Sequence, residues 1–160
     1  MLVKLDTFFS RYGSYHNNRV NKGIHMLCIP MILWSGMGLM LFLNKQFYYE
    51  DTMYSINCAT IFFTLLMSLY ILIDLVGGVI CTLFYGALYM SLNYLYYVHY
   101  LDQRQLCWNY LVYLNIASWI GQFIGHGFFE KRAPALMDNI FYAGIAPFFV
   151  VLEVFIYFLF

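Results

Sequence analysis

The sequence predicts an all-α protein, a polytopic bundle of transmembrane helices that forms a single domain over residues 1–160. Of its residues 63% are hydrophobic and only 10% are charged, and the mean hydropathy is +0.69. A soluble domain carries about 25% charged residues, so this chain has too few to cover a surface that faces water. Apolar stretches of about 20 residues, the length that a bilayer requires, recur along the whole chain.

The N-terminal segment, residues 2–15, mixes apolar and charged side chains, and its apolar residues recur at helical spacing. This pattern predicts a short amphipathic helix that lies on the membrane. The same pattern would also fit an N-terminal segment that packs on the protein itself, and this alternative stays open. Residues 16–25 follow as the most polar run of the chain.

Five apolar stretches are the expected spans. Pro30 lies near the start of the first, where proline is tolerated, and Pro147 is expected to kink the last. Asp74 and the pair Gly77-Gly78 interrupt the apolar pattern between the second and the third stretch. These two stretches could instead form one span and a re-entrant piece, which would give four spans in total. The expected boundaries are about 26–43, 53–73, 79–101, 106–128 and 139–160.

Basic residues predict the orientation, because cytoplasmic loops are rich in lysine and arginine. Five spans place six basic residues on the side of the N-terminus and two on the other side, so the N-terminus is expected in the cytoplasm. The six are Lys4, Arg11, Arg19, Lys22, Lys131 and Arg132, and the two are Lys45 and Arg104. In this arrangement segments about 100 residues apart meet at one face of the membrane.

The fourth span has a polar stripe within an arc of about 120°. We interpret its first three members as hydrogen-bonding groups that join helices. A ridge of small residues beside the stripe would let a neighbouring helix approach closely. The stripe consists of Asn115, Ser118, Gln122, His126 and Glu130, and the ridge of Ala117, Gly121 and Gly125.

The end of this stripe predicts a metal site. His126 and Glu130 are four residues apart, a spacing at which a helix can present two metal ligands. His16 and His25 are expected at the same membrane face, provided that Asn17-Asn18 and Gly23 interrupt the helix between them. Histidine and carboxylate ligands without thiolates suit non-haem Fe(II) or Zn, and spacing alone does not separate these metals.

Other polar residues carry weaker signals. His99 is interpreted as an interface residue at the opposite end of the third span. Glu153 lies inside the last span, where it could pair with His99 or face a cavity. The four scattered cysteines indicate core thiols. Zero net charge makes nucleic acid an unsuitable partner, because phosphate binding needs a surplus of basic residues.

The chain resembles a known family in two regions. The first contains Tyr15-His16, Asn18, Asn21, His25 and Pro30. The second runs from Gln122 through Gly125-His126-Gly127 and Glu130-Lys131-Arg132 to Pro134, Asp138-Asn139, Ala146-Pro147 and Glu153. These residues resemble the fungal-type 2-hydroxy fatty acid dioxygenases of the endoplasmic reticulum, which act in phytosphingosine breakdown. The resemblance covers essentially the whole chain. Fungal members have a second histidine where this chain has Asn17.

The resemblance implies Fe(II)-dependent α-oxidation, in which a 2-hydroxy fatty acid and O₂ give CO₂ and a fatty acid one carbon shorter. It implies that His16, His25 and His126 bind the iron. We expect Glu130 to be a catalytic residue, as a fourth ligand or as a partner that orients the ligands. Substrate contacts are expected from Tyr15, Asn21, Gln122, Lys131 and Arg132.

Two other functions stay open on the sequence. A family member without activity could be a structural or assembly subunit of a larger membrane complex. A lipid-binding or transport protein could use the same polar groups. The membrane of another organelle stays open beside the endoplasmic reticulum.

Overall fold

The computed structural model describes residues 13, 16–42, 56–96, 103–131 and 140–159. Within these ranges the chain is all-helical, which confirms the predicted class. The predicted amphipathic helix at residues 2–15 falls, apart from Gly13, outside the described residues. The described elements are α2 (Arg19–Phe42), α3 (Cys58–Ile73), α4 (Leu75–Leu95), α5 (Arg104–Ile124), the π-helix η2 (Gly125–Glu130) and α6 (Ile140–Leu159).

Helix α2 begins at Arg19, well before the expected start of the first span at Met26. Asn18 caps it, because its Oδ1 accepts hydrogen bonds from the backbone N–H of Val20 at 2.8 Å and of Asn21 at 3.4 Å. Gly23 lies inside α2, so the prediction that it interrupts the helix between His16 and His25 was wrong. Only the segment up to Asn18 separates His16 from the helix that carries His25.

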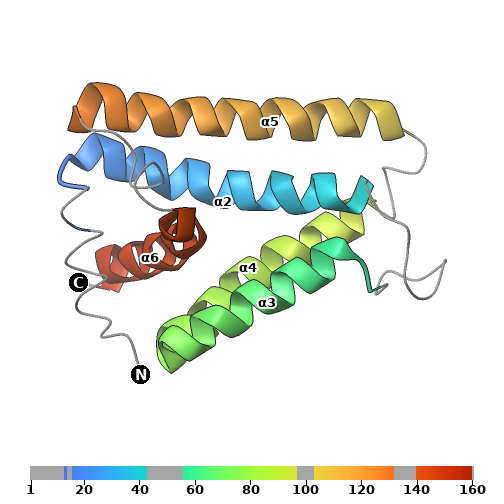
Figure 1. The fold of residues 1–160 in the computed structure, drawn as a ribbon, viewed down its shortest axis with the longest axis horizontal. Coiled ribbons are helices and arrows are strands. Elements are labelled where there is room, and N and C mark those ends of the chain that lie inside the picture. The colour runs from blue at the N-terminus through green and yellow to red at the C-terminus, as the bar shows by residue number, and fades with distance from the viewer. Residues whose placement is uncertain (1–12, 14–15, 43–55, 97–102, 132–139, 160) are drawn as a thin grey trace.

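Helices α2 and α5 run side by side along the length of the molecule (Figure 1). The predicted small-residue ridge makes this approach possible. A Cβ added at Gly121 would come within 2.8 Å of Cys28 Sγ, and one added at Gly125 would collide with Asn21 Oδ1. Asn115 Nδ2 joins the same two helices by donating to the carbonyl of Ile32 at 3.2 Å and to the Oγ of Ser35 at 2.9 Å.

Helices α3 and α4 form a tight hairpin around Asp74 (Figure 1). Asp74, which was expected to interrupt the apolar pattern, is the single residue between the two helices. It ends α3 and caps α4, since its Oδ1 accepts from the backbone N–H of Gly77 at 2.7 Å. A Cβ at Gly78 would lie 2.5 Å from the backbone of Ile71. The glycine pair therefore lies inside α4, where its lack of side chains lets the two helices pack directly.

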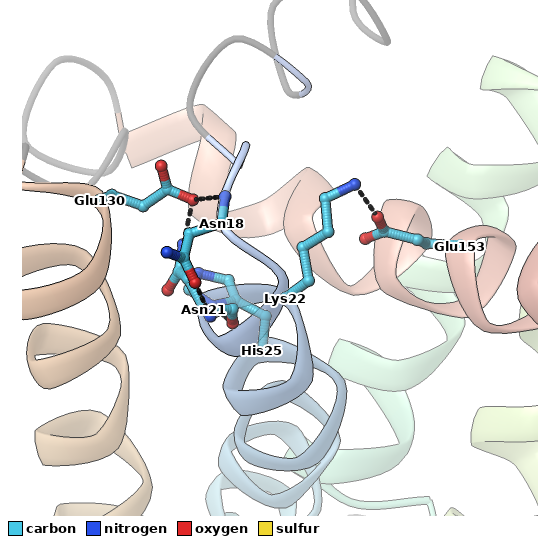
Figure 2. A network of polar contacts seen from close by, with 6 residues as sticks. All are labelled: Asn18, Asn21, Lys22, His25, Glu130 and Glu153. Carbon is cyan, nitrogen blue, oxygen red and sulfur yellow. Dashed lines mark hydrogen bonds and ion pairs between the residues drawn. The ribbon is translucent and has the colours of Figure 1, made fainter.

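Helix α6 packs on the end of this hairpin. Tyr70 donates its hydroxyl to the carbonyl of Gly144 at 2.7 Å, and Tyr85 donates to the carbonyl of Pro147 at 3.0 Å. Both tyrosines are fully buried. Figure 2 shows α6, which carries Glu153, running across the direction of the first part of α2, which carries Lys22.

Two of the described helices, Arg19–Phe42 and Leu75–Leu95, are long and apolar enough to cross a membrane, each with a mean hydropathy of 1.8. Cys58–Ile73 and Ala143–Phe155 are shorter apolar helices. These helices are compatible with a membrane protein. They do not confirm the predicted five spans.

The crossing of α6 over α2 brings Glu153 to Lys22, with Lys22 Nζ 2.6 Å from Glu153 Oε1 (Figure 2). The sequence suggested His99 or a cavity for Glu153 and did not suggest Lys22 as its partner. His99 itself lies outside the described residues.

The Lys22–Glu153 ion pair is expected to contribute little to stability. Its side chains are 35% and 20% exposed, and exposed pairs are worth about 0.2–1 kcal/mol. A double-mutant cycle with Lys22→Met and Glu153→Gln, measured by unfolding in mixed micelles, should give a coupling energy in this range. A coupling above about 2 kcal/mol would instead indicate a desolvated pair.

Candidate metal centre

Three histidines from distant parts of the chain meet at one end of the α2–α5 pair. His16 precedes α2, His25 lies on α2, and His126 lies in η2. Their side chains are 5%, 2% and 3% exposed. The ring centroids are 4.6 Å apart for His16 and His25, 4.7 Å for His25 and His126, and 5.2 Å for His16 and His126. One ligand nitrogen from each ring lies within 4.8 Å of the others.

His126 is placed by a π-helical segment that the sequence did not predict. Residues Gly125–Glu130 continue α5 with wider turns, and Lys131 ends the segment in the left-handed conformation with φ of 53°. Short π-helical segments occur often at functional sites. We find no residue pattern that signals this one, although Gly125 permits the contact with Asn21.

The ring of His25 is held in one tautomer. Its Nδ1 lies 2.9 Å from the backbone carbonyl oxygen of Asn21, so it donates a proton there. In the neutral ring Nε2 then carries the lone pair, and it faces His126 Nε2 at 3.0 Å. A metal ligand needs this arrangement, with one nitrogen anchored and the other free to bind.

Glu130 joins η2 to the start of α2. Its Oε1 accepts from the backbone N–H of Asn18 at 2.8 Å and from Asn21 Nδ2 at 3.1 Å (Figure 2). Burial raises the pKa of the Glu130 carboxyl, but these hydrogen bonds outweigh it and hold the pKa below its ordinary value. The carboxylate is therefore ionised at neutral pH. It is not among the clustered ligand groups found in the described part of the chain.

The other predicted site residues differ in burial and in their contacts. Asn21 is fully buried and contacts Glu130. Gln122 is buried near Cys28, and Lys131 is exposed just beyond η2. Tyr15 and Arg132 lie outside the described residues. Sequence reasoning did not predict the contact of Asn18 with Glu130 or that of Lys22 with Glu153.

The histidine cluster suits a transition metal. Its donors are three imidazoles, and no cysteine belongs to a ligand group among the described residues, a set that fits iron or zinc. The Nε2 atoms of His25 and His126 are 3.0 Å apart, close enough for one ion to bind both, since metal–nitrogen bonds are about 2.1 Å long.

Two buried polar atoms beside the cluster have no hydrogen-bond partner among the described residues, His126 Nδ1 and Asn21 Oδ1. Buried polar atoms are nearly always paired. An unpaired ring nitrogen on a candidate ligand agrees with a site that is completed only when an ion binds.

Comparisons with known proteins give a matching family model and a similar protein. The family model described as "2-hydroxy-palmitic acid dioxygenase Mpo1-like" matches residues 2–158. The chain is 34% identical over 153 residues to the 2-hydroxy-palmitic acid dioxygenase MPO1 of Saccharomyces cerevisiae, an alignment that covers 95% of this chain and 80% of that protein. No solved structure matches the chain.

Proposed function

Because the chain belongs to the Mpo1-like family of 2-hydroxy-palmitic acid dioxygenases, we propose that it is an Fe(II)-dependent dioxygenase of 2-hydroxy long-chain fatty acids. The 2-hydroxy acid and O₂ give the fatty acid one carbon shorter, CO₂ and water. This balance needs no other reductant, since the substrate supplies all the electrons. The observation that carries the proposal is the buried cluster of His16, His25 and His126.

These three histidines would hold the ion. When bound, the ion supplies the site at which O₂ and the 2-hydroxy acid are activated together. The Asn21 carbonyl fixes the ring of His25, and Glu130 ties η2 to α2. Burial of the three rings limits the access of water. Because of these contacts, we favour for Glu130 a role in orienting the ligands over a role as a fourth ligand.

The substrate is amphiphilic, so its head group and its acyl chain need different surroundings. Lys131 is exposed a few residues beyond His126, where it, with Arg132, would hold the substrate carboxylate at the membrane surface. Tyr15 and Gln122 would contact the head group, while the acyl chain lies between helices. The enzyme would act in phytosphingosine breakdown at the endoplasmic reticulum membrane, with its N-terminus in the cytoplasm.

Removal and return of the metal test this function. The protein purified in detergent should convert 2-hydroxypalmitate and O₂ into the C15 fatty acid and CO₂. A chelator should reduce the product to background, Fe(II) should restore it, and Zn(II) should not, because zinc has no redox chemistry. Full turnover in the chelated protein, or no binding of iron at all, would contradict the proposal.

A further inference from the structure

The tip of the α3–α4 hairpin exposes large aliphatic side chains. Leu72, Leu75 and Val76 are 74%, 66% and 68% exposed, and they flank Asp74, the single residue between the two helices. Asp74 is only half-buried, but its carboxylate folds back onto α4 to cap the backbone N–H of Gly77. A turn that faces water is normally polar. The surroundings of this tip are therefore expected to be apolar.

The tip lies on the same side of the molecule as the histidine cluster. A Cβ added at Gly77 would come within 2.9 Å of Phe148 on α6, and Glu153, further along α6, pairs with Lys22 near the start of α2. Figure 1 shows the tip and the first turns of α2 toward the same end of the molecule. Helix α6 thus contacts both the tip and the segment that carries His25.

The hairpin is too short to carry its tip through a bilayer into water. Helix α3 has 16 residues and α4 has 21, which at 1.5 Å per residue give about 24 Å and 32 Å. The hydrocarbon core is about 30 Å thick, and the headgroup layers bring the total to about 40–45 Å. The hairpin is also inclined to α2 and α5 (Figure 1). It therefore reaches less deep than its length when those two helices stand upright in the membrane.

The other end of α4 suits a membrane interface. Tyr94 is 53% exposed there, and tyrosine is enriched where the bilayer meets water. From Tyr94 to Leu75 the helix rises only about 29 Å. With Tyr94 at one interface, the tip ends below the headgroup layer of the opposite leaflet.

The sequence of the hairpin does not draw the tip into the headgroup layer. Asp74 is the one charged residue between positions 53 and 101, whereas cytoplasmic loops are rich in lysine and arginine. Backbone groups in lipid must be paired within the protein. At the tip Asp74 N–H donates to the carbonyl of Tyr70 at 3.1 Å, and the carbonyl of Asp74 accepts from Gly78 N–H at 2.8 Å. These bonds lower the cost of placing the turn in lipid.

We propose that the α3–α4 hairpin is re-entrant. It enters the membrane from the side opposite the histidine cluster and turns back among the acyl chains of the leaflet on the cluster's side. The partner of Leu72, Leu75 and Val76 is therefore lipid. The inference rests on the membrane embedding of the chain and does not depend on the proposed iron site. It gives the chain fewer crossings than the five expected from the sequence.

Spin labels measure the depth of the tip. The full chain, with its native cysteines replaced by alanine, is reconstituted in phosphatidylcholine nanodiscs with a nitroxide on Leu75→Cys. Relaxation by O₂, which concentrates in lipid, should exceed relaxation by a water-soluble Ni(II) chelate. The ratio should match that of Leu83→Cys, a control within α4 at a residue that is 71% exposed. Arg19→Cys, at the exposed start of α2, is the aqueous control and should give the opposite ratio.

Two outcomes would overturn the inference. A ratio like that of Arg19→Cys would place the tip in water, and weak relaxation by both agents would show that protein covers it, from this chain or from a second copy. Wild-type protein covers the case in which the cysteine-free chain does not fold. In liposomes whose phospholipid carries a photoreactive group in mid-chain, mass spectrometry should find crosslinks within residues 72–76. Crosslinks at Leu83 without any at the tip would contradict the proposal.

Discussion

Replacing His25 or His126 by alanine is expected to abolish metal binding and, with it, the conversion of 2-hydroxypalmitate to the C15 acid. Each residue supplies one buried imidazole to a cluster of three, so each variant leaves only two donors. The loss of affinity should be at least about 100-fold, the upper end of what losing a mere hydrogen-bond partner of a ligand costs. Metal content after dialysis and product formation under saturating O₂ measure the effect.

His99→Ala is the matched control, since His99 is the one remaining histidine of the chain and the sequence predicts it at the opposite end of a span. It should keep wild-type metal content and turnover. Turnover retained by His126→Ala would refute the proposed metal centre.

Gly125→Ala is expected to destabilise the protein and weaken its metal site together. The added Cβ would collide with Asn21 Oδ1 at the contact between α2 and η2. Overpacking of this kind costs about 1–3 kcal/mol. Because Asn21 also contacts Glu130 and His25, its displacement should lower metal affinity as well. Thermal unfolding in detergent and metal titration measure the two effects.

Gly127→Ala, in the same π-helical segment, provides the comparison. A Cβ there meets nothing within 4 Å, and alanine restricts the unfolded chain, so this variant should gain about 0.4–1 kcal/mol. Equal stability of the two variants would show that the contact between Gly125 and Asn21 does not limit how closely α2 approaches η2.

Much of the site follows from local patterns. The histidines are rare polar residues in an apolar chain, and burying them costs free energy unless they are paired, which indicates a function. The small-residue ridge at Gly121 and Gly125 also follows from spacing, because helices that pack closely need small side chains at regular intervals. These features depend only on residue type and period.

Local patterns were right at Asp74 and wrong at Gly23. Asp74 was expected to interrupt the apolar pattern, and it is the single residue between α3 and α4. Gly23 was expected to interrupt a helix, yet α2 continues through it. Packing against α5 outweighs the small propensity cost of one glycine, about 1 kcal/mol.

The sequence by itself determined the helical class, the family and the three histidines, since each depends on composition or on a motif within one segment. Only the tertiary structure decided that α6 crosses α2, that Lys22 pairs with Glu153, and that Asn21 contacts both Glu130 and His25. Lys22 and Glu153, like Asn21 and Glu130, are more than 100 positions apart in the sequence. Their partners are selected by the directions in which helices pack, and a linear pattern does not contain those directions.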